Sequence, residues 1–119
     1  MERVRYVTHG GKSILLVELN GCTATEMIDV FDSVEEIVTA QPAHSVLTLC
    51  DFGGAELDRD AITRMKEVAV MDRPHVRRAA FVGTEDLPKV YYKALETFSV
   101  REFPAFKTRE EALEWLVED

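Results

Sequence analysis

Residues 46–62 read VLTLCDFGGAELDRDAI, and this stretch decides the fold. The residues at 46–50 form a nearly continuous apolar run, which is typical of a strand covered on both faces in a mostly parallel sheet. The run ends at Asp51, a glycine pair follows, and Asp58 can cap a helix whose apolar residues recur at helical spacing from Ile62. The stretch therefore predicts a buried strand, a turn and an amphipathic helix, which together form the repeating unit of an α/β fold.

The residues before this unit predict a hairpin and a first helix. Residues 4–8 and 13–19 are rich in β-branched and aliphatic side chains, and the two glycines between them suit a tight turn. The pattern Thr23-x-x-Glu26 is typical of a capping box, and apolar residues follow it at helical spacing until Pro42. We therefore expect two antiparallel strands and then an amphipathic helix.

Two further strands and a closing helix are expected after the unit. Residues 79–82 predict a buried strand, and residues 103–106 predict a last strand at the sheet edge, because Pro104 cannot donate to a ladder. Thr108-x-x-Glu111 is a second capping-box pattern and predicts the start of the closing helix.

A third helix is expected between these last two strands, with Thr84 or Asp86 as its cap. Its apolar residues recur at helical spacing and predict one face directed at the core. The residues expected on that face are Leu87, Val90, Tyr91, Ala94, Leu95 and Phe98.

These elements predict an α/β fold in one domain, 1–119, in which an N-terminal β-hairpin is followed by alternating αβ units. The sheet is expected to be mostly parallel and covered by about four helices. Ligands of such sheets usually lie beyond the carboxyl ends of the strands, which directs attention to the loop after the central strand. The candidate interaction residues in that loop are Asp51, Gly53, Gly54, Asp58, Arg59 and Asp60.

Composition restricts the class of partner. The chain has 119 residues and a formal net charge of −8, so we expect no binding of nucleic acid. No apolar stretch is long enough for stable membrane insertion and no signal-peptide core is present, which makes the cytoplasm the expected location. The basic run at 73–78 is interpreted as a solvated loop rim.

No residue pattern points to catalysis, a cofactor or a metal, and we expect a protein that is not an enzyme. Cys22 and Cys50 lack the spacing of a zinc site or a disulfide framework, and both are expected to be small buried residues. A weaker alternative is a phosphoryl-accepting receiver site, because Asp51, Thr84 and Lys107 each follow a predicted strand. The acidic pair that such a site needs after its first strand is missing.

The hairpin, the αβ order and the stretch at 46–62 resemble the SpoIIAA-like group of the STAS family. The ending TREEALEWL at 108–116 is similar to that of a small, uncharacterised branch of this group. The resemblance implies a SpoIIAA-like (STAS/SEC14) fold, which the lipid-binding CRAL-TRIO domains share. It also implies a regulatory or ligand-binding module.

The resemblance also defines what this chain lacks. Anti-sigma factor antagonists of the group carry Asp-Ser-Ser-Gly after the corresponding strand, and a partner kinase phosphorylates the second serine. The matching residues here are Asp58, Arg59, Asp60 and Ala61, so the phosphorylatable serine is absent. Asp60 either imitates the modified state through one fixed negative charge or only favours the start of a helix.

Two functions remain open at this point. The first is a non-enzymatic regulatory or protein-interaction module with a protein partner, and a homodimer formed through an edge strand is a further candidate assembly. The alternative is a small apolar-ligand or lipid-binding carrier of the SEC14-like type. Its cavity is expected to be lined by Met27, Phe31, Met65 and Met71.

Overall fold

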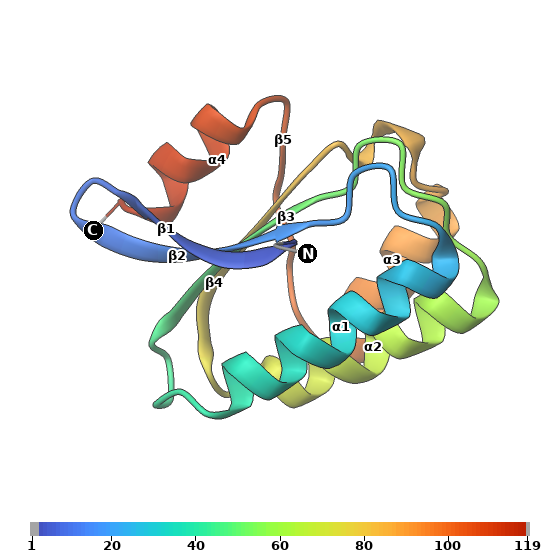
Figure 1. Cartoon of the computed structure of the whole chain (residues 1–119), viewed down its shortest axis with the longest axis horizontal. Helices are drawn as coiled ribbons and strands as arrows, with labels where there is room; N and C mark the ends of the chain where they lie inside the picture. The colour runs from blue at the N-terminus through green and yellow to red at the C-terminus, as the bar shows by residue number, and fades with distance from the viewer. Residues whose placement is uncertain (1–2, 119) are drawn as a thin grey trace.

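The computed structural model of the chain describes residues 3–118, the side chain of Asp86 excepted, and contains a five-stranded sheet (Figure 1). β1 pairs antiparallel with β2, whereas every later pair of neighbours is parallel. The predicted hairpin and the mostly parallel sheet are therefore confirmed. In sheet order the strands are β1 (Val4–His9), β2 (Lys12–Glu18), β3 (Val46–Asp51), β4 (Val76–Val82) and β5 (Ala105–Phe106).

Four α-helices cover the sheet unequally. α1 (Ala24–Thr39), α2 (Arg59–Asp72) and α3 (Lys89–Ser99) lie on one face, and α4 (Arg109–Leu116) lies on the other (Figure 1). The strands follow one another across the sheet in chain order, so successive crossovers of the same hand place their helices on the same face. The chain reaches the second face only after β5, its last strand.

Alternating side chains of β2 divide the core between these two faces. Leu15 and Val17 pack with the three-helix layer, whereas Ile14 and Leu16 pack with α4. All four side chains are buried. The continuous apolar run in the sequence therefore results from a strand that is covered on both faces, as for β3.

Local capping signals placed three of the helix starts correctly. The Thr23 hydroxyl accepts a hydrogen bond from the Glu26 N–H, and the Glu26 carboxylate accepts one from the Thr23 N–H, which completes the predicted capping box. Asp58 and Thr108 are the N-caps of α2 and α4, and each side chain accepts a backbone N–H of its first turn.

The predicted start of the third helix is wrong. Thr84–Asp86 forms a short 3-10 turn, η1, and α3 begins only after Pro88, which supplies no side-chain cap. The later start is accompanied by a rotated inward face, on which Leu95 and Ser99 are buried. Val90 and Phe98, which were expected in the core, are 69% and 56% exposed.

Two strand boundaries also differ from the prediction. β4 begins at Val76 because this residue pairs with Val46 of β3, and the strand continues through two arginines. β5 contains only Ala105–Phe106 of the expected 103–106, although it does lie at the sheet edge. Both boundaries are set by pairing with the neighbouring strand. A local pattern of apolar residues carries no information about that pairing.

Within residues 3–118, no helix combines the length and the apolar character that crossing a bilayer requires.

Candidate functional site

Asp51 lies at the carboxyl edge of the sheet, as its position at the end of a parallel strand predicts. It is the last residue of β3, and its register neighbours are Glu18 on β2 and Val82 on β4. Its carboxylate therefore stands between the ends of two neighbouring strands, where α/β proteins commonly bind ligands.

Gly53 and Gly83 bring two neighbouring loops of this edge into backbone contact. A Cβ atom at Gly83 would lie 2.4 Å from the Gly53 nitrogen, and Gly83 itself has a φ of +70°. Asp51 fixes the same turn, because its Oδ1 accepts the Gly53 N–H at 3.0 Å. Gly54 also has a φ of +70°, a conformation that residues with a Cβ rarely adopt. The backbone conformation therefore favours glycine at Gly54 and at Gly83, whereas a Cβ atom at Gly53 would lie 3.3 Å from the Asp51 Oδ1 in an ordinary backbone conformation.

Ion pairs neutralise the carboxylates of this edge. The Arg109 Nε donates to Asp51 Oδ2 at 2.8 Å, and its Nη2 donates to Glu18 Oε2 at 2.9 Å. Arg5 donates to the other oxygen of Glu18. Hydrogen bonds from Arg5 and Arg109 hold the pKa of Glu18 below its usual range. We call these four residues the carboxyl-edge network, and its two cations balance its two anions.

The other candidate residues form a separate, exposed surface, which we call the α2 rim: Asp58, Arg59 and Asp60. The Asp58 Oδ1 accepts the Ala61 N–H at 2.8 Å, which is the cap of α2. Arg59 and Asp60 are exposed, and neither side chain forms a hydrogen bond or an ion pair with the described side chains or backbone. The structure therefore separates the six candidate residues into a turn at the sheet edge and a rim at the start of α2.

The alternative receiver site is placed at the same sheet edge. Asp51, Thr84 and Lys107 follow β3, β4 and β5, which are neighbours in the sheet. However, the carboxylate of Asp51 is already bonded to Arg109 and to the Gly53 N–H. A phosphoryl acceptor needs a free carboxylate oxygen for attack, so this arrangement does not favour the receiver alternative.

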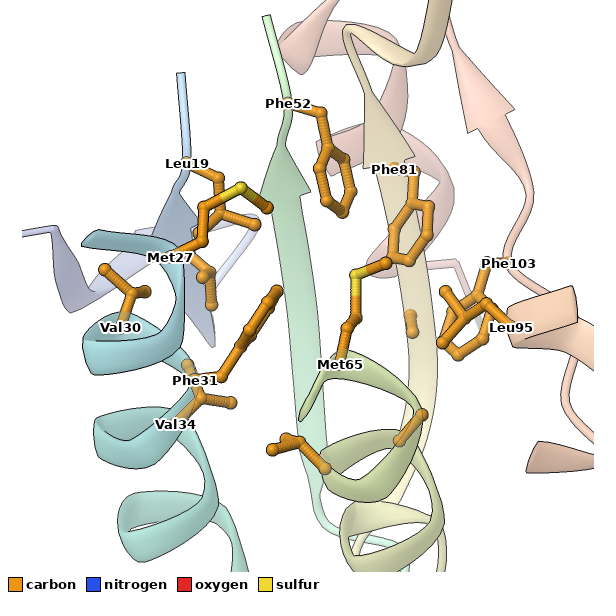
Figure 2. Close-up of a cluster of buried hydrophobic side chains, with 14 of the residues drawn as sticks. Leu19, Met27, Val30, Phe31, Val34, Phe52, Met65, Phe81, Leu95 and Phe103 are labelled. Atoms are coloured by element: carbon orange, nitrogen blue, oxygen red, sulfur yellow. The ribbon is translucent and has the colours of Figure 1, made fainter. Parts of the chain in front are cut away.

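A small cavity lies between the sheet and the helices α1, α2 and α3, among the apolar side chains of Figure 2. Its volume is about 50 Å³. Phe31 and Met65 line it, as predicted for a ligand cavity. Met27 is buried but is not part of the lining, and Met71 is 53% exposed, so the expectation for these two residues is wrong. The helical spacing of apolar residues predicts which side chains face the core. It does not show which of the buried side chains line a cavity.

Two charged side chains, Asp72 and Arg101, line this cavity and do not form an ion pair within 4.0 Å. Asp72, the last residue of α2, is 4% exposed, and its Oδ1 has no hydrogen-bond partner. Burial raises the pKa of Asp72 to about 7, against the opposing effect of the Arg101 charge. The Arg101 Nη1 donates to the Ala69 carbonyl at 2.9 Å, and its guanidinium lies 4.6 Å from the Phe103 ring centroid. Burial also lowers the pKa of Arg101.

A larger cleft opens at the other end of the strands, where β4 begins. Its volume is about 620 Å³. We call it the amino-edge cleft, and the residues that line it include Arg73, Arg77, Arg78, Arg101 and Trp115. The basic run at 73–78 was interpreted as a solvated loop rim, but Arg77 and Arg78 belong to β4 and line the cleft. Arg101 and Trp115 are distant from this run in the sequence and reach the cleft only because of the fold. The sequence therefore did not predict the cleft.

Comparisons with known proteins agree with this architecture. A family model described as SpoIIAA-like matches residues 9–117. A crystal structure of an uncharacterized protein of the DUF3478 family from Shewanella loihica PV-4, described as having a SpoIIAA-like fold, is similar with a TM-score of 0.72. The similarity covers 95% of this chain and 91% of that chain at 16% sequence identity, and it shows the shared fold alone. No curated protein matches the chain.

Proposed function

The chain belongs to the SpoIIAA-like family, and we propose that it acts as a non-enzymatic regulatory module that binds a protein partner through the α2 rim. The observation that carries this proposal is a pair of exposed charges in the first turn of α2. Arg59 and Asp60 have no hydrogen-bond or ion-pair partner among residues 3–118, so both remain available to another protein.

Backbone hydrogen bonds hold the loop before the α2 rim in one conformation. The Gly21 N–H donates to the Gly53 carbonyl and the Glu56 N–H donates to the Cys22 carbonyl, both at 2.9 Å. The Ala55 N–H closes the turn on the Phe52 carbonyl at 2.9 Å. A surface that is already ordered loses little conformational entropy when a partner binds, which favours association.

Two features support the non-enzymatic part of the proposal. The carboxylate of Asp51 is engaged by Arg109, which leaves it poorly suited to act as a general acid or base. Burial raises the pKa of the Cys50 thiol to about 12, so this sulfur stays protonated and is a poor nucleophile at neutral pH.

The proposal is tested by exchanging the charges of the rim. In Arg59→Glu/Asp60→Lys the net charge and the Asp58 cap are both unchanged. Glu85→Lys/Lys89→Glu makes the same exchange at two exposed residues, one in η1 and one at the start of α3, and is the matched control. We expect cross-linking and affinity capture from the native host to recover one partner with wild type and control but not with the rim variant. Equal recovery with all three proteins would contradict the assignment of this surface.

A small apolar-ligand carrier is the second candidate, and the apolar cavity between the sheet and α1, α2 and α3 supports it. The cavity of about 50 Å³ is smaller than the engineered void of about 150 Å³ that accommodates benzene. An acyl chain would therefore require these helices to move away from the sheet. Native mass spectrometry of protein purified gently from its host tests this candidate, because a carried ligand adds a mass that disappears on denaturation. The same spectrum reports whether the chain forms a homodimer.

A further inference from the structure

The amino-edge cleft concentrates positive charge on an acidic protein. Four of the 14 lysines and arginines line it, although the whole chain carries a formal net charge of −8. Glu102 is the one carboxylate that the described lining contains. The cleft is therefore a local cationic region on a surface that is otherwise rich in acidic groups.

None of these four arginines forms an ion pair with a carboxylate of the described side chains, although the charge of Asp72 acts on Arg101 from beyond ion-pair distance. Among residues 3–118, none of Arg73, Arg77, Arg78 and Arg101 has an Asp or Glu oxygen within 4.0 Å. The arginines of the carboxyl-edge network, in contrast, all have carboxylate partners. Neighbouring cations that lack a counter-charge repel one another, and an anion bound between them would remove that repulsion.

Packing fixes the direction of two of these side chains. The Arg78 Nη1 donates to the Trp115 carbonyl at 2.6 Å, and its guanidinium lies 5.1 Å from the Trp115 ring centroid. Arg101 is held in the same way by the Ala69 carbonyl and the Phe103 ring. Each guanidinium has five N–H donors, and each of these two uses one in the hydrogen bond described. Both side chains line the cleft, and their other N–H groups form no hydrogen bond with the described side chains.

Arg73 and Arg77 complete the cleft from its exposed side. Both side chains are exposed, and neither has a hydrogen-bond partner in the described chain. Free guanidinium groups can turn to bind an anion through two parallel N–H bonds, a geometry that suits phosphate oxygens. A multivalent anion interacts with four cations more strongly than a single carboxylate does.

We propose that the amino-edge cleft binds a compact ligand that carries a phosphate or pyrophosphate group. The group comes either from a soluble phosphorylated molecule or from the headgroup of a phospholipid. A long polyanion is disfavoured because the acidic surface beyond the cleft repels it. This site lies at the opposite edge of the sheet from the α2 rim, and it is independent of the function proposed for that rim.

The fluorescence of Trp115 can report whether a ligand is bound in the amino-edge cleft. It is the single tryptophan of the chain, and it lies beneath the Arg78 guanidinium at the cleft. We expect inorganic pyrophosphate, titrated at low ionic strength, to change Trp115 fluorescence in a saturable way. Isothermal titration calorimetry with the same probe measures the affinity.

Two variants and a matched control test the site. Arg73→Gln and Arg77→Gln each remove an exposed charge that has no partner in the described fold, so both should fold normally. Lys93→Gln removes the same charge from an exposed position of α3 that does not line the cleft. Each cleft variant should weaken pyrophosphate binding by about tenfold, as expected for the loss of a charge-assisted hydrogen bond. The control should bind like wild type.

Vesicle sedimentation distinguishes the two sources of phosphate. Arginine-dependent binding to phosphatidylcholine vesicles that contain phosphatidic acid, but not to phosphatidylcholine alone, identifies a headgroup. Saturable binding of pyrophosphate without binding to these vesicles identifies a soluble ligand.

Absence of binding to both probes would overturn the proposal, as would equal affinity in wild type, Arg73→Gln and Arg77→Gln. A preference for a single-stranded oligonucleotide over pyrophosphate would also overturn it, because the ligand would then be an extended polyanion.

Discussion

The carboxyl edge and the amino edge, where the parallel strands end and begin, both carry several charged side chains. These charges are paired at the carboxyl edge and, among the described residues, lack ion-pair partners at the amino edge. At the carboxyl edge, Arg109 joins Asp51 to Glu18, and every charge of the network has a partner. At the amino edge, the arginines of the cleft have no carboxylate within ion-pair distance in the described chain, and the nearby Asp72 has an unpartnered oxygen. The first arrangement stabilises the fold, whereas the second leaves interaction energy available to a ligand.

This difference shows that the position of a charge at the end of a strand or helix does not reveal its role. Asp51 and Asp72 are both aspartates at the end of a regular element. The carboxylate of Asp51 accepts from Arg109 and from a backbone N–H, and that of Asp72 is buried with an oxygen that accepts nothing. The hydrogen-bond partners of each carboxylate therefore show that Asp51 has a structural role, whereas Asp72 carries an oxygen whose hydrogen bonding is unsatisfied.

Breaking the loop contact at the carboxyl edge should have the largest effect. In Gly83→Ala the new Cβ meets the Gly53 backbone at 2.4 Å while φ stays at +70°. We expect a loss of about 3 kcal/mol or more in the free energy of unfolding, measured by urea denaturation. Gly21→Ala is the matched control, because Gly21 has a φ of +71° and no atom lies within 4 Å of the place that its new methyl group would take. Gly21→Ala should lower the free energy of unfolding by only about 1–2 kcal/mol. Equal losses in the two variants would show that the loop contact contributes nothing to stability.

Removing the unpartnered carboxylate should stabilise the protein in a pH-dependent way. Because burial raises the pKa of Asp72 from 3.8 to about 7, the folded state binds its proton more tightly than the unfolded state. Wild type therefore loses stability as the pH rises from about 4 to about 7, at about 1.4 kcal/mol for each unit of the shift. Asp72→Asn lacks this loss and should exceed wild type at pH 8 by about 2–4 kcal/mol. The difference between the two urea-unfolding curves should nearly vanish at pH 4, and a difference independent of pH would refute the argument.

Removing the central cation of the carboxyl-edge network should cost less. In Arg109→Met the neighbouring carboxylates of Glu18 and Asp51 lose their shared partner. These groups are partly exposed to solvent, so we expect a loss of about 1–2 kcal/mol. Asp51→Asn in the same background should recover part of this loss by removing the repulsion, which a double-mutant cycle measures. A strictly additive result would show that the two residues do not interact.

The smallest effect on stability is expected at the amino edge. Arg77→Gln removes an exposed side chain without a partner in residues 3–118, and the free energy of unfolding should change by less than about 0.5 kcal/mol. A loss as large as that of Arg109→Met would mean that the two edges do not differ as described.

Much of the fold follows from local patterns. The apolar run at 46–50 and the cap at Asp58 predicted β3 and α2 almost to the residue, because burial on both faces and helix capping leave direct signals. The phase of α3 was not predictable in the same way. Its apolar residues fit more than one helical face, and the late start after Pro88 left Val90 and Phe98 exposed.

The sites were less accessible to sequence reasoning than the fold. Strand order placed Asp51 at the carboxyl edge, but its partner Arg109 lies 58 positions later in the chain. The arginines at 73–78 were visible as a basic run, while Arg101 reaches the same cleft through tertiary packing. Such pairings over long separations have no local signature, so the sequence indicated candidate residues and the fold decided which of them meet.

The unequal covering of the sheet has a consequence for how the protein opens. α4 has 8 residues, and the apolar side chains of β2, β3 and β4 on its face pack against it. Its ends are tied by Arg109 at the start and by bonds to the Trp115 and Val117 carbonyls at the finish. Brief detachment of this two-turn helix would expose a hydrophobic sheet surface while the three-helix layer stayed folded. Hydrogen exchange should therefore be faster in α4 than in α1, and the solubility of the protein during storage depends on how firmly this one helix stays docked.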